Sequence, residues 1–255
     1  MNESIAMCCN VYNDVGPLRG LLETSSRYFD NLFVVNSGPG GAKSTDGTIE
    51  LCEQFGATIV FDDMNRGFGA IRSRLIHDCG CTFAFILDAD ERFIPQLPIM
   101  HCEGVERYPV NPKPNLSVFH KNEVCNQGQL LRQIIQDSTV MAVKTHRRHW
   151  MDFSMKQACE NWLLIKDPQL RIVRNHPEIG YETGKVMHER LLDHRTKQDP
   201  KHYEPDAYQG PFHDHFHMAF RKAKPGYKEA REREYQKLER GETMTAENMD
   251  NFQQA

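Results

Sequence analysis

The chain has 255 residues, of which 39% are hydrophobic and 26% charged, and its formal net charge at pH 7 is −4. This composition is typical of a globular protein and excludes a disordered chain, while the slight acidity argues against general binding to phosphate polymers. No apolar run approaches the roughly 20 residues of a membrane helix, no signal peptide is recognised and the eight cysteines form no Cys-x-x-Cys pair, so we expect a cytoplasmic protein with free thiols and no integral membrane contact.

Short apolar runs alternate with amphipathic segments through the first ninety residues. The predicted strands cover Ser4–Val11, Leu32–Val35, Thr58–Phe61 and Thr82–Leu87. The predicted helices cover Leu18–Phe29, Thr45–Phe55 and Asn65–Asp78. Strands that alternate with helices at this spacing indicate parallel βαβ units, and strands that are apolar throughout indicate helices on both faces of the sheet. We therefore predict an α/β fold with a mostly parallel sheet.

Polar or acidic residues follow all four predicted strands. They are Asn13-Asp14, Asn36-Ser37, Asp62-Asp63 and Asp88-Ala89-Asp90. In open α/β sheets ligands bind beyond the carboxyl ends of the strands, and a purely structural sheet would not need polar groups at all four ends. The sequence therefore predicts a binding site at this edge.

The pattern Asp88-Ala89-Asp90 is the strongest chemical signal at that edge. In an extended segment, residues two apart face the same way, so the two carboxylates repel each other unless a cation compensates them. Mg²⁺ and Mn²⁺ suit carboxylate oxygens and keep positions open for phosphates. The alternative is a solvated turn, but the buried strand before it favours the ion.

Four motifs follow one another in this part of the chain. They are the strand and polar turn Ile5–Asn13, the helix start Ser44–Thr48, the Gly-Phe-x-x-x-Arg run within Arg66–Arg74 and the Asp-x-Asp within Leu87–Glu91. Their order and spacing resemble the GT-A fold glycosyltransferases of the family 2 type. The resemblance implies a GT-A type, Rossmann-like sheet flanked by helices with a mixed acceptor-side extension.

The resemblance also implies roles for individual residues. Arg72 would lie near the nucleotide or sugar, Asp88 would face the ribose or the ion, and Asp90 would hold Mn²⁺ or Mg²⁺ on the diphosphate. The implied nucleotide contacts are Asn10, Tyr12, Asn13, Asn36, Ser37, Asp62, Asp63, Gly67, Arg72, Asp88 and Ala89. Asn36 stands where the family usually has an acid. The resemblance implies UDP ahead of other nucleotides.

The remainder of the chain is expected to form the acceptor side. We predict a single domain over 1–240, with a nucleotide-sugar half at 1–94, an acceptor half at 95–240 and a flexible tail at 241–255. Further strands are predicted at Leu116–Phe119, Thr139–Lys144 and Leu170–Asn175, and helices at Gln129–Gln136 and Lys224–Arg240.

The segment Lys144–Trp150 is a basic cluster with an aromatic residue beside it. It is either a solvated loop, as charge runs usually are, or a contact for a phosphate-rich acceptor, since arginine suits phosphate geometry. The second reading keeps a hydroxylated base in DNA among the possible acceptors.

An acid that follows the predicted strand Leu170–Asn175 is the first candidate for a general base. The run Val186-Met187-His188-Glu189 is similar to a Val-His-Glu or Val-x-His-Glu run in the same glycosyltransferases. An inverting transfer needs a carboxylate that deprotonates the acceptor hydroxyl. Glu189, beside His188, is the first candidate, and Asp193 and Glu160 are alternatives. Glu189 as a structural or surface acid is the competing interpretation.

Histidine is in excess late in the chain, with nine of the twelve at or after His146. His213, His215 and His217 would share one face of an extended segment. The resemblance implies one histidine that completes the coordination begun at Asp90, with His217 first and His215 second. A separate zinc site and ordinary loop histidines are the alternatives.

These residues together predict a metal-dependent inverting glycosyltransferase that uses a nucleoside-diphosphate sugar. The acceptor hydroxyl belongs to a glycan, a small molecule or a hydroxylated base in DNA. The competing functions are a sugar nucleotidyltransferase, which normally has a Gly-rich loop after the first strand, and a non-catalytic protein that binds nucleotide sugars or nucleic acid.

Overall fold

The structure is a computed structural model, and it describes residues 3–97, 125–149, 168–183, 189–204 and 212–216, with a few isolated residues beyond. The predictions for Leu116–Phe119 and Trp150 lie outside these residues, as does nearly all of the helix predicted over Lys224–Arg240. Within the described part of the chain, no helix has the length and apolar character needed to cross a membrane.

The first ninety residues form the parallel half of the sheet. Its strands are β1 (Ile5–Val11), β2 (Asn31–Asn36), β3 (Thr58–Phe61) and β4 (Phe83–Ile86). Neighbouring strands pair in parallel in the order β3-β2-β1-β4. All four predicted strands are confirmed. Mostly apolar runs of this kind are typical of a parallel sheet that helices cover on both sides.

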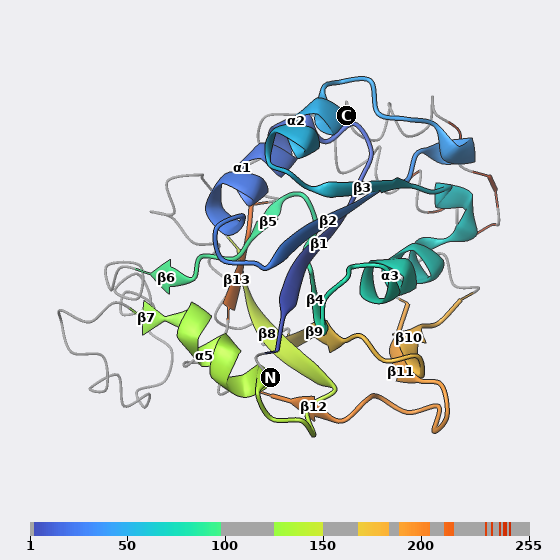
Figure 1. The fold of residues 1–255 in the computed structure, drawn as a ribbon. Helices are drawn as coiled ribbons and strands as arrows, with labels where there is room; N and C mark the ends of the chain where they lie inside the picture. Colours follow the sequence, from blue (N-terminus) through green and yellow to red (C-terminus); the bar gives the residue numbers. More distant parts are fainter. Residues whose placement is uncertain are drawn as a thin grey trace, which may run out of the picture.

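Helices cover both faces of this half, as predicted (Figure 1). They are α1 (Val15–Ser25), α2 (Thr48–Gln54) and α3 (Phe68–His77), with short 3₁₀ turns η1 (Pro39–Gly41) and η2 (Met64–Arg66). The alternation of β1 divides the core: Met7 and Cys9 pack with α1 and α2, whereas Ala6 and Cys8 pack with α3.

The second half of the chain extends the same sheet. The larger elements are α5 (Gln127–Ile135), β8 (Ala142–His149), β9 (Pro168–Arg174) and β13 (Phe212–His215). The short strands are β5 (Glu91–Arg92), β6 (Gln96–Leu97), β7 (Cys125–Asn126), β10 (Ile179–Tyr181), β11 (Leu191–Asp193) and β12 (His202–Tyr203).

The main sheet has nine strands in the order β3-β2-β1-β4-β9-β8-β13-β5, with β12 also paired to β8 (Figure 1). The pairs β4–β9, β8–β9 and β13–β5 are antiparallel and the other pairs are parallel. The predicted α/β fold with a mostly parallel sheet and a mixed extension is therefore confirmed. The pairs β6–β7 and β10–β11 form two separate ribbons.

Two predictions need correction. The basic segment that begins at Lys144 is not a loop, because β8 runs through His149 and is paired on both sides. The third helix begins at Phe68 and not at Asn65, because η2 and Gly67, whose φ is 85°, come first. Charge content and helical propensity alone do not reveal these tertiary and backbone constraints.

Candidate active site

The loops after β1 and β2 are tied together where the two strands end. The Asn36 amide donates to Ser44 Oγ and to the Val11 carbonyl, and its oxygen accepts the Ser44 N–H at 3.2 Å. Ser44 Oγ also accepts the Asn13 N–H at 2.9 Å, and Asn13 Oδ1 accepts the Thr45 N–H at 2.8 Å. Asn36 is only 1% exposed, so its side chain has a structural task, and the nucleoside contact stays a prediction.

Asn10, Tyr12 and Ser37 lie at the same strand edge. The Ser37 hydroxyl, which is fully buried, donates to Asn10 Oδ1. The Tyr12 ring packs so closely on Gly38 that a Cβ there would overlap it. The residues predicted to surround a nucleoside are therefore gathered in one place, although their ligand contacts remain predictions.

Asp62 and Asp63 organise the loop after β3. Asp62 is paired with Arg66 at 2.9 Å and with Arg74 at 3.0 Å. Burial opposes ionisation of Asp62, but the Asp63 N–H and the two guanidinium groups hold its pKa below the usual value. Asp63 accepts the Gly40 N–H at 2.8 Å. Both carboxylates are thus bound by other groups of the protein, and their contact with a nucleotide base stays a prediction.

The glycines at the start of α3 bring this helix into the site. Gly67 has a φ of 85°, a left-handed value that favours glycine. A Cβ on Gly69 would overlap the carbonyl oxygen of Glu182. This close approach sets α3, and with it Arg72, beside the segment that carries Glu189.

The motif after β4 folds into a tight turn. The Glu91 N–H donates to the Asp88 carbonyl at 2.8 Å, and Glu91 Oε2 accepts the Asp88 N–H at 3.0 Å. Ala89 is buried inside the turn, whereas the Asp88 side chain is 45% exposed and that of Asp90 is 22% exposed. The two aspartates therefore remain accessible while the rest of the turn is fixed.

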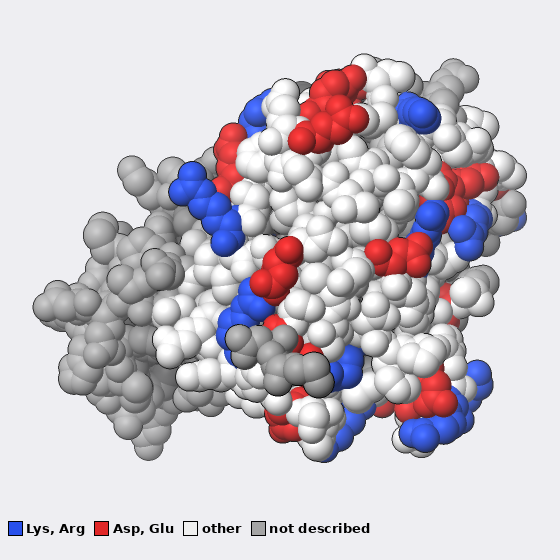
Figure 2. Space-filling view, viewed as in Figure 1, with Lys and Arg blue, Asp and Glu red and all other residues white. Residues whose placement is uncertain are grey.

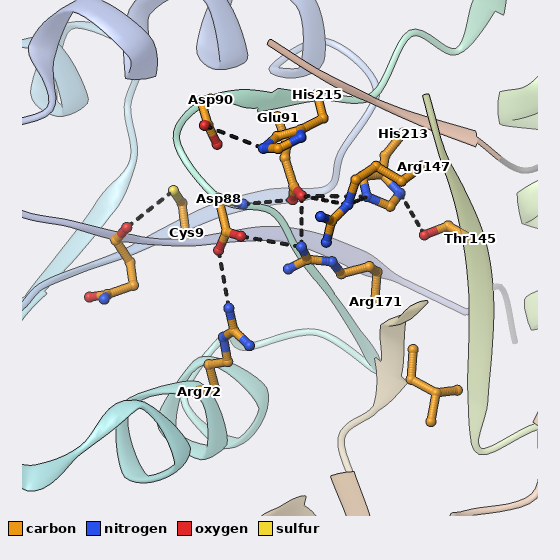
Figure 3. A network of polar contacts seen from close by, with 12 residues as sticks. Cys9, Arg72, Asp88, Asp90, Glu91, Thr145, Arg147, Arg171, His213 and His215 are labelled. Carbon is orange, nitrogen blue, oxygen red and sulfur yellow. Dashed lines mark hydrogen bonds and ion pairs between the residues drawn. The ribbon is translucent and has the colours of Figure 1, made fainter. Parts of the chain in front are cut away.

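Asp88 lies between two arginines (Figure 3). Its Oδ1 is 3.3 Å from Arg72 Nη2, and its Oδ2 is 3.2 Å from Arg171 Nη2. Partial removal from water would raise the pKa of Asp88, but the two guanidinium groups, Arg171 foremost, hold it below the usual value. The charge of Asp88 is thus compensated by two arginines of the protein, and its predicted contact with the ion or the ribose stays a prediction.

Glu91 is a fully buried carboxylate behind the turn (Figure 3). Its Oε1 lies 2.7 Å from Arg171 Nη2, 3.4 Å from His213 Nε2 and 3.7 Å from Arg147 Nε. Burial opposes its charge, but Arg171 and His213 hold its pKa well below the usual value. Burial lowers the pKa of His213, whose Nδ1 is 2.8 Å from the Thr145 hydroxyl.

Asp90 pairs with His215, whose Nε2 lies 3.4 Å from Asp90 Oδ2 (Figure 3). Among the described residues, no group of three or more histidine, cysteine or acidic side chains is arranged to hold a metal. One carboxylate oxygen and one imidazole nitrogen nevertheless form a pair of metal ligands that suits Mn²⁺. The pair fits the predicted ion, and the preferred third ligand, His217, lies outside the described residues.

Glu189 enters the site through Arg72. Arg72 Nη1 is ion-paired with Glu189 Oε1, so one guanidinium bridges Glu189 and Asp88. The Glu189 side chain is 4% exposed. The nearby negative charges, Asp88 foremost, outweigh burial and raise the pKa of Arg72, which therefore stays charged. The predicted base and the predicted nucleotide-binding acid are thus neighbours in space, although they are 101 residues apart in the sequence.

The other proposed bases are placed differently. Asp193 accepts the N–H groups of Arg195 and Thr196 at 2.9 and 3.3 Å, so it closes the turn after β11. Its partners among the described residues lie in this turn and not at Asp88 or Asp90. His188 and Glu160 lie outside the described residues.

Glu91 and Arg171 lie at this turn without having been predicted as site residues, and Asp14 was predicted only as one of the polar groups at the strand ends. Glu91 had a signal, since it directly follows the Asp-x-Asp motif, whereas Arg171 reaches the turn only because β9 pairs with β4. Burial raises the pKa of Asp14 to about 7, and the charges of Asp90 and Asp88 add to the effect. A carboxyl group perturbed in this way is typical of functional sites.

The predicted basic cluster is divided by the alternation of β8. Arg147 and Thr145 lie on the side of Glu91 and His213. Lys144, on the other face, is paired with Glu204 at 2.8 Å. The described part of the cluster therefore does not present one continuous basic surface. On the face seen in Figure 2, acidic and basic side chains of the described residues are interspersed.

The chain matches no protein-family model and no curated protein sequence. Several solved structures are similar to it in part. One is S. aureus TarS, with 16% identity, a TM-score of 0.30 and coverage of 40% of this chain and 19% of the other. Another is described only as a mycobacterial protein, with 17% identity, a TM-score of 0.35 and coverage of 58% and 42%.

A third similar structure is glucosyl-3-phosphoglycerate synthase from Mycobacterium tuberculosis, in complex with Mn²⁺, UDP and glucosyl-3-phosphoglycerate. Its identity is 16%, its TM-score 0.34 and its coverage 57% of this chain and 44% of the other. The chain spans less than half the length of each of these proteins, and likenesses this partial leave the function to be argued from the chain's own residues.

Proposed function

We propose that the chain is a metal-dependent glycosyltransferase that moves a sugar, with inversion, from a nucleoside-diphosphate sugar to an acceptor hydroxyl. UDP is the nucleotide that we expect. The observation that carries the proposal is the bridge of Arg72 between Asp88 and Glu189, beside the pair Asp90–His215. The acid predicted to face the nucleotide, the pair predicted to hold the ion and the candidate base are therefore neighbours, which supports the proposal together with the order of motifs that resembles such enzymes.

Each side chain then has a task in the transfer. Asp90 and His215 would hold Mn²⁺ or Mg²⁺, which, when bound, supplies a Lewis acid for the charge that builds on the leaving diphosphate. Asp88, held by Arg72 and Arg171, would accept hydrogen bonds from the ribose. Glu189 would take the proton of the acceptor hydroxyl as this oxygen attacks the anomeric carbon.

The acceptor is more consistent with a glycan or a small molecule than with DNA. Nucleic-acid contacts need several cations on one accessible surface. In the described part of the chain, Lys144 is neutralised by Glu204, and Arg147 is turned toward Glu91. A shift of duplex DNA in a gel that weakens as salt is raised would restore the modified-DNA acceptor.

A thermal-shift panel of UDP, GDP and ADP, each with and without Mn²⁺, tests the donor site, and mass spectrometry of products from a panel of sugar donors tests transfer. We expect UDP with Mn²⁺ to stabilise the protein most. Asp90→Asn should reduce both the Mn²⁺-dependent shift and turnover by at least tenfold, because a neutral amide is a poor ligand for a hard ion. Asp78→Asn, which removes an exposed partner of Arg74, is the control.

Wild-type turnover in Asp90→Asn would contradict the metal role. No response to any nucleoside diphosphate would contradict the function as a whole and favour a protein with another ligand. Release of pyrophosphate from a sugar phosphate and a nucleoside triphosphate would instead identify a sugar nucleotidyltransferase.

A further inference from the structure

The buried carboxylate of Glu91 has no role in the proposed transfer, yet three side chains from three other strands and the Asp88 N–H of its own turn converge on it. We propose that Glu91 is a positioning residue. It fixes Asp88, Asp90 and His215 in the geometry that binds Mn²⁺ and the nucleotide diphosphate, without itself contacting either. This inference rests on the proposed function.

Glu91 first fixes Asp88, through both its main chain and its side chain. Glu91 Oε2 accepts the Asp88 N–H at 3.0 Å, so the side chain of Glu91 closes the turn as well as its main chain. Glu91 Oε1 holds Arg171 Nη2 at 2.7 Å, and the same nitrogen donates to Asp88 Oδ2 at 3.2 Å. The Asp88 carboxylate is thus oriented by an arginine that Glu91 itself holds in place.

Glu91 also fixes the metal-binding pair, through β13. His215 lies opposite Glu91 in the antiparallel pair β13–β5, and the Phe216 N–H donates to the Asp90 carbonyl at 2.9 Å. His213, two residues before His215 and on the same face, directs its Nε2 at Glu91 from 3.4 Å. The strand that carries His215 is therefore anchored to Glu91 by backbone pairing and by a side chain.

The charge of Glu91 is as important as its shape. Arg171 is 5% exposed, and Glu91 and Asp88 are its two carboxylate partners in the described part of the chain. Removal of one member of a buried ion pair leaves an uncompensated charge. Without the Glu91 charge, Arg171 would have Asp88 alone, and we expect this stronger pull to draw Asp88 out of its binding geometry.

The substitution Glu91→Gln tests this, because it keeps the size of the side chain and an acceptor for the Asp88 N–H but removes the charge. Mn²⁺ binding is measured on the full chain by the loss of the free Mn²⁺ signal in electron paramagnetic resonance, with and without UDP. We expect the affinity for Mn²⁺ in the presence of UDP to fall at least tenfold. Wild-type affinity in a folded Glu91→Gln protein would overturn the proposal, whatever its thermal stability.

Asp30→Asn is the matched control. Asp30 also accepts a backbone N–H, that of Ile5 at 2.7 Å, and is paired with an arginine, Arg132, at 2.7 Å. It precedes β2 at the opposite edge of the sheet, so the control should keep its Mn²⁺ affinity even where its melting temperature falls. An equal loss of Mn²⁺ affinity in Asp30→Asn would overturn a specific role for Glu91.

His213→Gln decides the matter if Glu91→Gln does not fold, because it removes one anchor without leaving a charge unpaired. A weaker Mn²⁺ affinity in the presence of UDP supports the proposal, and a wild-type affinity overturns it. The proposed function fails separately: a wild-type chain that binds neither UDP nor Mn²⁺ removes it, and this inference with it. A wild-type chain that binds both, alongside variants that bind equally well, removes only the role of Glu91.

Discussion

Two arginines of this site each bind two carboxylates. Arg171 links Asp88 to Glu91, and Arg72 links Asp88 to Glu189. A planar guanidinium has several donors in fixed directions, so it can hold two carboxylates at once, which the single ammonium of lysine does less well. Asp88 is therefore the shared partner through which the candidate base and the buried Glu91 are connected.

The raised pKa of Asp14 predicts how this residue makes the stability of the fold depend on pH. Burial, with the charges of Asp90 and Asp88, raises its pKa to about 7 from an ordinary value of 3.8. Between these two pH values the unfolded chain ionises Asp14 and the folded chain does not. The folded state therefore holds the extra proton, and the contribution of Asp14 to stability falls as the pH rises through this window.

Asp14→Asn should remove this penalty. Without metal, in the presence of EDTA, the variant should exceed the wild type in stability by up to about 4 kcal/mol at pH 8, since the pKa is raised by about three units and each unit is worth about 1.4 kcal/mol. The gain should vanish near pH 4. Urea unfolding at a series of pH values measures both, with Glu53→Gln on the surface of α2 as a control for loss of charge. Stability curves that stay parallel to the wild type would contradict the assignment.

At the scale of elements, glycines decide how closely α3 approaches its neighbours. A Cβ on Gly69 would overlap the Glu182 carbonyl oxygen, whereas one on Gly16 in α1 would have no heavy atom within 4 Å. Gly69→Ala should therefore cost about 1–3 kcal/mol through overpacking. Gly16→Ala should be neutral or stabilise the protein by up to about 1 kcal/mol.

Urea unfolding compares the two alanine variants directly. The pair separates steric overlap from the general effect of alanine on a helix, because both glycines lie in helices. Equal stabilities for the two variants would show that α3 and the Glu182 segment are not in close contact.

The sequence predicts most of the parallel half, because each of its strands contains a short, mostly apolar run that is followed by a turn. The prediction for Thr58–Phe61 agrees with β3 at both ends. The weaker predictions depend on pairing. In β8 the run from Lys144 to His149 is polar or basic throughout, with no apolar alternation, a pattern that fits a loop as well as a strand between two partners.

The same limit applies to the site. Asp88 and Asp90 could be predicted because two acids after a buried strand are a local pattern. The pairing of Glu91 with Arg171, 80 residues away, could not, because it depends on β9 lying antiparallel beside β4. The pairing of Asp90 with His215 agrees with the second-ranked histidine, and the contact is made by the β13–β5 register.

At the scale of the whole molecule, the two predicted halves share one sheet and one site. β4, the last long strand of the first half, pairs with β9 through Phe83, Ala84 and Phe85. One core combines Phe83 and Phe85 with residues of α5, β8 and β9. The acidic turn after β4 takes its buried cations from Arg147 and Arg171 in the second half.

A fragment of residues 1–97 should therefore not fold alone. It would leave the whole β9 side of β4 unpaired, expose the apolar surface that α5 covers, and remove Arg147, Arg171 and His213 from around Glu91. The total stability of a domain is only about 5–15 kcal/mol, so the loss of this pairing and burial is enough to unfold it. We expect a fragment with no cooperative thermal transition in circular dichroism and with collapsed amide dispersion in its ¹H–¹⁵N spectrum. The full chain in the same buffer is the reference, and a cooperative transition in the fragment would show that the parallel half is an independent domain to which the second half merely docks.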